Sequence, residues 1–170
     1  MIGAAQALLG VLSDTHGDVP GWVLKLFHAK NVTAIIHAGD AVDDTAVSRL
    51  SSIAPLTIVR GNMDVRGDQS AVVEFCGHFA YVVHSIDHLD IDPVAAGMKV
   101  VITGHTHVPS IEWRNGILYL NPGSASHPRW GNPPSVAIIE VEGRQLRPSI
   151  WFEDSVGNAT PAAGTAGLNF

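Results

Sequence analysis

Cysteine is almost absent from the sequence, with Cys76 as the single example among 170 residues. One cysteine allows no internal disulfide and cannot build a cysteine-rich structural zinc site. Long apolar runs are also lacking, because none approaches the roughly 20 residues that a membrane-spanning helix requires. The apolar opening segment 1–12 has no basic flank of the kind that begins a signal peptide. We therefore expect a cytoplasmic protein without membrane association.

Positive charge is scarce as well. The chain has 10 Lys and Arg residues against 16 Asp and Glu residues, which gives a formal net charge of -6. An acidic protein of this kind lacks the broad positive field that general nucleic-acid binding requires. A bound metal ion would change the balance locally, because its charge exceeds that of any single side chain beside it.

What the sequence does contain is enough apolar material for one core. Hydrophobic residues make up 46% of the chain, and 170 residues suffice for one full domain but hardly for two. We find no internal repeat. The segment 154–170 is rich in Gly, Ala and Thr without periodicity, so we expect a domain over 1–153 followed by a flexible C-terminal tail.

The first half of the chain alternates between strand-like and helix-like segments. Apolar runs at 7–12, 32–40 and 55–64 predict strands, and the spacing of apolar residues at 22–30 and 44–51 predicts helices between them. Such alternation favours a parallel α/β layer. Ligands of such sheets bind beyond the carboxyl ends of the strands.

The second half is richer in strands. The segments 72–75 and 78–85 resemble a hairpin, 91–98 suggests a short helix, and 99–107 suggests another buried strand. Asn115-Gly116 is a strong hairpin signal within 110–124, and 135–152 has the pattern of a further hairpin. The sequence therefore predicts antiparallel or mixed pairing in this half.

Polar residues close five of these apolar runs and make up the candidate metal ligands. They are Asp14, His16, Asp40, Asn62, His84, His105 and His107. Carboxylate, imidazole and amide donors together suit divalent Mn, Fe, Co, Ni or Zn. His105 and His107 alternate as the chain leaves a strand, so their side chains point to the same side.

The order of these motifs resembles the calcineurin-like metallophosphoesterase superfamily, and in particular its small YfcE-type phosphodiesterase branch. The resemblance is carried by LSDTH at 12–16, GD at 39–40, GNMD at 61–64, His84, GHTH at 104–107 and NPGS at 121–124. It implies a four-layer α/β/β/α sandwich of two mixed β-sheets flanked by helices. It also implies a phosphodiesterase that acts on a small phosphoester substrate.

The resemblance further implies two divalent metal ions per chain. One ion would be held by Asp14, His16, Asp40 and His107, and the other by Asp40, Asn62, His84 and His105, so that Asp40 bridges. A water or hydroxide between the ions would be the nucleophile. Mn²⁺ is the favoured metal, with Ni²⁺, Fe²⁺, Co²⁺ and Zn²⁺ as alternatives.

The chain departs from the family pattern at two places, of which the first concerns the proton donor and the second a possible supporting or substrate contact. Many relatives have a histidine after the Gly-Asn pair, whereas this chain has Met63 and Asp64. We therefore consider Asn62, Asp64 and His105 as catalytic candidates, although Asp64 could instead brace a neighbouring loop. Ser85 follows His84 where the family often has Gly and then His, and His88 is a candidate substitute.

Substrate contacts are predicted for Asn62, through its amide, and for Arg129, whose guanidinium could hold a phosphate. Arg129 could equally be a surface arginine. The other histidines, at positions 28, 37, 78, 88 and 127, have sequence contexts typical of packed or solvated side chains.

Three rival functions stay open at this point. The chain could keep the family's fold but serve as a weak or inactive metal-binding scaffold for protein partners. A dinucleoside polyphosphate hydrolase would need more basic residues than this chain has, and a mononuclear structural protein would bind one ion. A homo-oligomer is compatible with the sequence, which identifies no interface.

Overall fold

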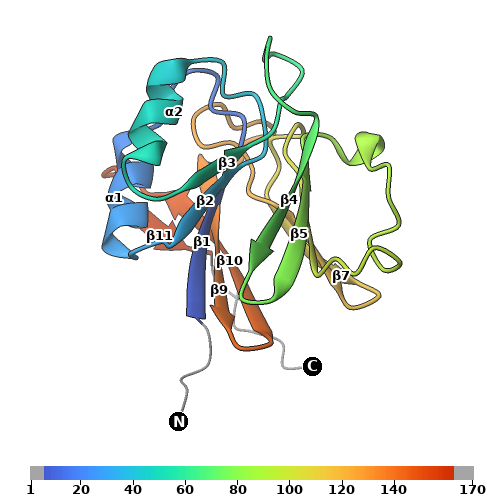
Figure 1. The fold of residues 1–170 in the computed structure, drawn as a ribbon. Helices are drawn as coiled ribbons and strands as arrows, with labels where there is room; N and C mark the ends of the chain where they lie inside the picture. The colour runs from blue at the N-terminus through green and yellow to red at the C-terminus, as the bar shows by residue number, and fades with distance from the viewer. Residues whose placement is uncertain (1–5, 163–170) are drawn as a thin grey trace.

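In the computed structural model, residues 6–162 are described, and they form two β-sheets packed face to face (Figure 1). The first sheet has six strands in the order β11-β10-β9-β1-β2-β3. Their bounds are β1 Gln6–Leu12, β2 Ala34–His37, β3 Leu56–Ile58, β9 Ser135–Glu142, β10 Gln145–Glu153 and β11 Ala159–Pro161. β1, β2 and β3 are parallel, and β9, β10 and β11 add to them in antiparallel fashion, so the sheet is mixed.

The second sheet has five strands in the order β4-β5-β6-β8-β7. Their bounds are β4 Ser70–Phe75, β5 His78–Val83, β6 Val100–Ile102, β7 Ser110–Arg114 and β8 Ile117–Asn121. β5, β6 and β8 are parallel, whereas β4 and β7 pair antiparallel at the two edges. The turn between β7 and β8 is Asn115-Gly116, as the sequence predicts, with φ of 52° and 74°.

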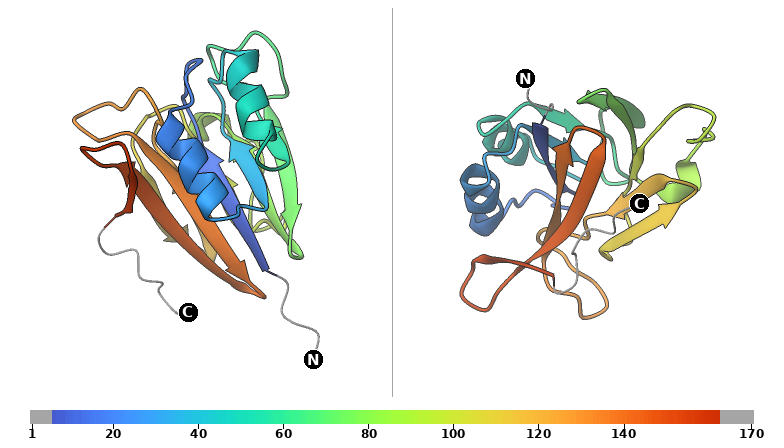
Figure 2. Two further views of the ribbon diagram at one scale, coloured as in Figure 1. Left: turned by 90° about the vertical axis from the view of Figure 1, so that its left-hand side faces the viewer. Right: turned by 90° about the horizontal axis from the view of Figure 1, so that it is seen from below.

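The main core lies between the two sheets. It is built from alternate residues of strands in both, such as Val11 and Ile139 from the first sheet and Val82 and Ile102 from the second. The outer face of the first sheet is covered by α1 (Gly21–Ala29) and α2 (Asp44–Ser51), which lie side by side on it (Figure 2). Their apolar residues form a second core, in which Phe27 and Leu50 are fully buried.

The α/β sandwich with two mixed sheets is confirmed, but its fourth layer is not an α-helix. A turn-rich segment lies over the second sheet, where Leu89, Ile91 and Met98 pack on Tyr81 and Val83. The segment contains only the 3₁₀-helix η1 (Ile86–His88).

The prediction of a helix over 91–98 is wrong. Asp92 turns the chain by accepting hydrogen bonds from the backbone of Val94 and Ala95, and Gly97 has a φ of 71°. A glycine in the left-handed region stops the segment after one turn.

The last described residues differ from the expected flexible tail. Residues 159–161 form β11, which pairs with Trp151, Phe152 and Glu153 of β10. Residues 163–170 of the expected tail lie outside the described part of the chain. Within the described part, no helix is long and apolar enough to span a membrane.

Candidate metal centre

The candidate ligands lie on the loops that follow the carboxyl ends of β1, β2, β3, β5 and β6. These strands belong to two sheets, and the loops meet at the edge where the sheets come together (Figure 1). Backbone hydrogen bonds join the loops: Asp14 N donates to Gly39 O, and Gly104 N donates to His84 O. The fold thereby brings together residues that are up to 93 positions apart in sequence, from Asp14 to His107.

Five candidate ligands adopt the left-handed backbone region, which is unusual for residues other than glycine. The φ angles are 53° at Asp14, 46° at His16, 57° at Asp40, 68° at His105 and 60° at His107. Each such residue costs about 1–3 kcal/mol of strain, which the rest of the fold must offset. Clustered strain of this kind is typical of functional sites.

Two glycines permit the close approach of the loops. A Cβ on Gly61 would lie 2.0 Å from Asp40 Oδ1, and one on Gly104 would lie 1.9 Å from Ser13 Oγ and 2.8 Å from Asp14 Oδ2. Any side chain at either position would displace an acidic candidate ligand.

His84 and His107 are held in one tautomer by backbone carbonyls. His84 Nδ1 lies 2.7 Å from Ala38 O, and His107 Nδ1 is hydrogen-bonded to His127 O. Because a carbonyl only accepts, each Nδ1 carries a proton, and the neutral ring then presents its lone pair at Nε2. Carbonyl partners of this kind orient the histidines of metal sites.

In the neutral rings these lone pairs face carboxylate and amide oxygens. His107 Nε2 lies 3.2 Å from Asp14 Oδ1, and His84 Nε2 lies 3.5 Å from Asp40 Oδ2 and 3.0 Å from Asn62 Oδ1. Within residues 6–162, Asp14 Oδ1 is fully buried and has no hydrogen-bond partner. A buried anionic oxygen surrounded by lone pairs is costly unless a cation lies among them. The residues therefore fit divalent metal ions.

The donor atoms form two groups, each compact enough for one ion. Asp14, His16 and His107 make the first group, and Asp14, Asp40 and His84 make the second. Asp14 belongs to both groups, whereas the family resemblance implies that Asp40 bridges the ions. Asp40 has one oxygen engaged, because Oδ1 accepts from Met63 N at 2.7 Å, and Oδ2 faces His84.

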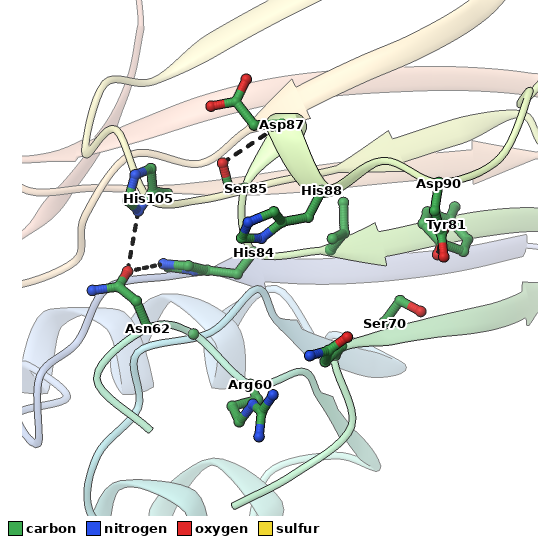
Figure 3. A pocket seen from close by; sticks show the side chains of 13 residues that line it. Arg60, Asn62, Ser70, Tyr81, His84, Ser85, Asp87, His88, Asp90 and His105 are labelled. Carbon is green, nitrogen blue, oxygen red and sulfur yellow. Dashed lines mark hydrogen bonds between the residues drawn. The ribbon is translucent and has the colours of Figure 1, made fainter. Parts of the chain in front are cut away.

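His16, Asn62 and His105 complete the set at the solvent side. His16 Nε2 lies 3.5 Å from His107 Nε2, and burial lowers the pKa of His16 while Asp40 and Asp14 oppose that shift. Asn62 and His105 are exposed, and Asn62 Oδ1 lies 3.1 Å from His105 Nδ1 (Figure 3). All seven predicted ligands are thus brought to one site, with His105 reaching it through Asn62.

Asp64 lies beside the site and faces the backbone. Its carboxylate accepts hydrogen bonds from Asp40 N, Val42 N and Gly61 N at 2.7–2.8 Å. Burial raises the pKa of Asp64, but the backbone N–H groups of Gly61, Val42 and Asp40 outweigh burial, so the net pKa is lowered. This carboxylate ties the loop after β2 to the loop after β3.

Arg129 is exposed and follows the NPGS loop at 121–124. Its backbone carbonyl accepts from Asn132, and the pocket beside Asn62 and His105 is lined by other residues. Its neighbour Trp130 is 85% exposed, so neither side chain belongs to the core.

Sequence reasoning missed the role of His127 and Ser124. The His127 carbonyl holds His107, and the His127 ring meets the ring of His16 edge-on at 5.1 Å. Ser124 is fully buried, donates to Asp14 O at 2.7 Å and accepts from His127 N at 2.8 Å. The NPGS motif at 121–124 was the available sequence signal for this loop. The His127 contacts could not be predicted, because they use backbone atoms that every residue has.

His37 is packed near the site, as the sequence predicts. It is fully buried, accepts from Gly39 N through Nδ1 at 3.2 Å, and its Nε2 lies 2.9 Å from Thr15 Oγ1. Burial lowers the pKa of His37 to about 4. The neutral ring therefore joins the loops after β1 and β2.

Fold and site together define a class: an α/β sandwich with a divalent-metal centre at the meeting edge of two mixed sheets. The family model of the calcineurin-like phosphoesterase superfamily domain matches residues 8–144. The chain therefore belongs to the calcineurin-like phosphoesterase superfamily and is a metal-dependent phosphoesterase.

Named relatives agree with this family. A probable metallophosphoesterase from Methanothermobacter thermautotrophicus is 32% identical over 82% of this chain and 88% of the relative. The phosphodiesterase YfcE of Escherichia coli is 29% identical over 75% of this chain and 84% of YfcE. Wild-type Vps29 from Entamoeba histolytica, solved in complex with zinc, superimposes with a TM-score of 0.77 at 20% identity, covering 91% of this chain and 97% of Vps29. At that identity the likeness to Vps29 concerns the fold alone.

Proposed function

We propose that this protein is a phosphodiesterase that uses two divalent metal ions, with Mn²⁺ as the favoured metal. The main support for bound metal is the buried Asp14 Oδ1. It has no hydrogen-bond partner within residues 6–162 and faces Nε2 of His107 and His84. Relatives named phosphodiesterases support the class of substrate. A cytoplasmic location stays a prediction from the sequence.

In this proposal, Asp14, His16 and His107 hold one ion, and Asp14, Asp40, His84 and Asn62 hold the other. Two such ions, when bound, activate water and stabilise negative charge on the phosphoryl oxygens. The protein orients the histidines: the carbonyls of Ala38 and His127 accept from Nδ1 of His84 and His107, which turns each Nε2 toward the metal position.

We assign the substrate side of the site to Asn62 and His105. Both are exposed and both line the pocket beside the centre, so an ester oxygen bound there can reach the Asn62 amide and the His105 ring. His105 is the candidate to donate a proton to the leaving group. Asp64 has a positioning role in this proposal, because its carboxylate already accepts three backbone N–H groups.

A metal-binding scaffold without turnover is the second candidate, because the fold and the donor groups alone do not require catalysis. The two candidates differ in turnover. The test is to strip the protein with chelator and restore Mn²⁺, Ni²⁺, Co²⁺, Zn²⁺ or Mg²⁺ singly, and then to follow hydrolysis of bis-p-nitrophenyl phosphate and p-nitrophenyl phosphate.

We expect metal-restored hydrolysis of the diester, which Asp40→Asn and His107→Ala abolish. Arg129→Ala serves as a separate probe, and a raised KM there would support the predicted phosphate contact. Metal binding without hydrolysis of either ester would contradict the phosphodiesterase and favour the scaffold.

A further inference from the structure

A pocket of about 610 Å³ opens beside the candidate metal centre. It shares Asn62, His84 and His105 with that centre, so a substrate held by the metals would extend into it. In Figure 3 these three residues lie at one side of the pocket, and Tyr81 and Asp90 lie at the other. The volume suits an ester group much larger than a methyl or ethyl group.

On the side of the pocket away from the metal centre, Tyr81 and Asp90 form a hydrogen-bonded pair. Tyr81 is buried on β5, and its hydroxyl donates to Asp90 Oδ1 at 2.5 Å. Burial and the bond to Asp90 both raise the pKa of Tyr81, so the phenol stays protonated and keeps donating. Asp90 is exposed and lines the pocket, and the Tyr81 hydroxyl engages its Oδ1.

The charge of the lining selects against a second phosphate. Among the described residues that line the pocket, Arg60 is the one Lys or Arg, whereas Asp87 and Asp90 are both carboxylates. A polyphosphate chain entering here would meet more negative than positive charge. A neutral or cationic group would be favoured instead, and an ammonium would form a charge-assisted hydrogen bond to a carboxylate.

We propose that the pocket binds one ester group of the substrate, and that this group carries an ammonium or hydroxyl donor for Asp90 Oδ2. The substrate class is thus a phosphodiester of an amino alcohol or polyol rather than of a polyphosphate. This inference rests on the proposed function for the position of the phosphate. It adds a specificity site that the metal centre alone does not have.

The direct test measures binding without turnover, by calorimetry on the Mn²⁺-loaded protein with phosphonates, whose carbon–phosphorus bond is not hydrolysed. The probes are ω-aminoalkyl and ω-hydroxyalkyl phosphonates of roughly three to six carbons, a range that brackets the span of such a pocket. Plain alkyl phosphonates of equal length are the controls.

We expect the best aminoalkyl phosphonate to bind about tenfold more tightly than its alkyl control, with the hydroxyalkyl probe between them. Asp90→Asn should reduce this preference to less than about twofold, while it leaves binding of the alkyl control unchanged. Tyr81→Phe should give an intermediate preference. Glu140→Gln, which removes the same charge from an exposed position on β9, should leave the preference intact.

Equal binding of amino, hydroxyl and alkyl probes would overturn the inference, and so would an equal loss for all probes in Asp90→Asn. Failure of every phosphonate to bind would overturn it as well. A tenfold preference in a protein that hydrolyses no ester would support the pocket assignment and contradict only the proposed phosphodiesterase.

Discussion

Asp64 accepts hydrogen bonds from the backbone of two different loops. These bonds favour a role in positioning the loops over a role as general acid. A general acid must carry a proton at working pH, but the N–H groups favour the ionised carboxylate. We therefore infer that Asp64 holds the backbone of Asp40 and Gly61 in place.

The corresponding prediction concerns Asp64→Asn. We expect the free energy of unfolding to fall by about 1–3 kcal/mol, because the amide oxygen replaces only part of the carboxylate's acceptor capacity. Metal affinity should fall, and the shape of the pH–rate profile should be kept. Asp68→Asn, at an exposed site nearby, is the control. If Asp64→Asn instead lost the alkaline limb of the pH–rate profile at unchanged metal affinity, Asp64 would be the general acid.

A second prediction concerns Gly61, which lies against the Asp40 carboxylate. In Gly61→Ala the new Cβ would lie 2.0 Å from Asp40 Oδ1 and 2.3 Å from Asp40 N, so the carboxylate must move. We expect metal affinity, measured by calorimetry, to fall by at least about tenfold, or ~1.4 kcal/mol. Gly21→Ala, where the added Cβ meets no heavy atom within 4 Å, should change nothing. Unchanged affinity in Gly61→Ala would show that Asp40 is not a ligand.

At the scale of elements, the site depends on loops that follow parallel strands of both sheets. The loop at 121–127 has no candidate ligand side chain, yet it holds two other loops by the Ser124 hydroxyl and the His127 carbonyl. Such contacts determine where Asp14 and His107 lie.

Ser124→Ala tests this loop. Removing the hydroxyl leaves the Asp14 carbonyl and the His127 N–H without their partner, which costs about 1–3 kcal/mol in a buried site. We expect a lower midpoint of urea unfolding and weaker metal binding. Ser52→Ala, at the exposed end of α2, should alter neither. A normal metal affinity in Ser124→Ala would limit the loop to a structural role.

The sequence predicted most elements because apolar runs and turn signals are local. The two strand–helix units followed by a third strand, and the Asn115-Gly116 hairpin, follow from periodicity and turn chemistry. The helix expected at 91–98 failed because Asp92 and Gly97 favour tight turns over a short apolar stretch. β11 was missed because its pairing with β10 depends on tertiary contacts rather than on its own Ala-Thr-Pro sequence.

For the site, residue types and order were sufficient to predict which side chains come together, and their distances could not be predicted. Asp14 lies between both donor groups because the left-handed turns at Asp14 and Asp40 fix where each carboxylate points. Nothing in the one-dimensional pattern distinguishes the two aspartates. The carbonyl partners of His84 and His107 were equally invisible, since any residue supplies a carbonyl.

For the whole molecule, buried His37 couples folding to pH. Burial lowers the pKa of His37 to about 4, whereas the unfolded value is 6.5. Because the folded state favours the neutral ring, this contribution to stability is complete above pH ~6.5 and declines as the pH falls toward 4. At pH 5 the loss for this group is about 2 kcal/mol.

We therefore expect chelator-treated protein to lose stability between pH 7.5 and 5 in urea unfolding, and His37→Gln to lose less over the same interval. Chelation removes the separate effect of acid on metal binding. An identical pH dependence in the two proteins would show that His37 does not carry this coupling.

We infer that a chain of net charge -6 gathers its acceptors around two ions where the two sheets meet. The most direct measurement is the number of Mn²⁺ ions bound per chain, by calorimetric titration and by elemental analysis of the dialysed protein. We predict two ions for the wild type and a loss of at least one in His107→Ala and in His84→Ala. One ion per chain in the wild type, or no ion, would contradict the account.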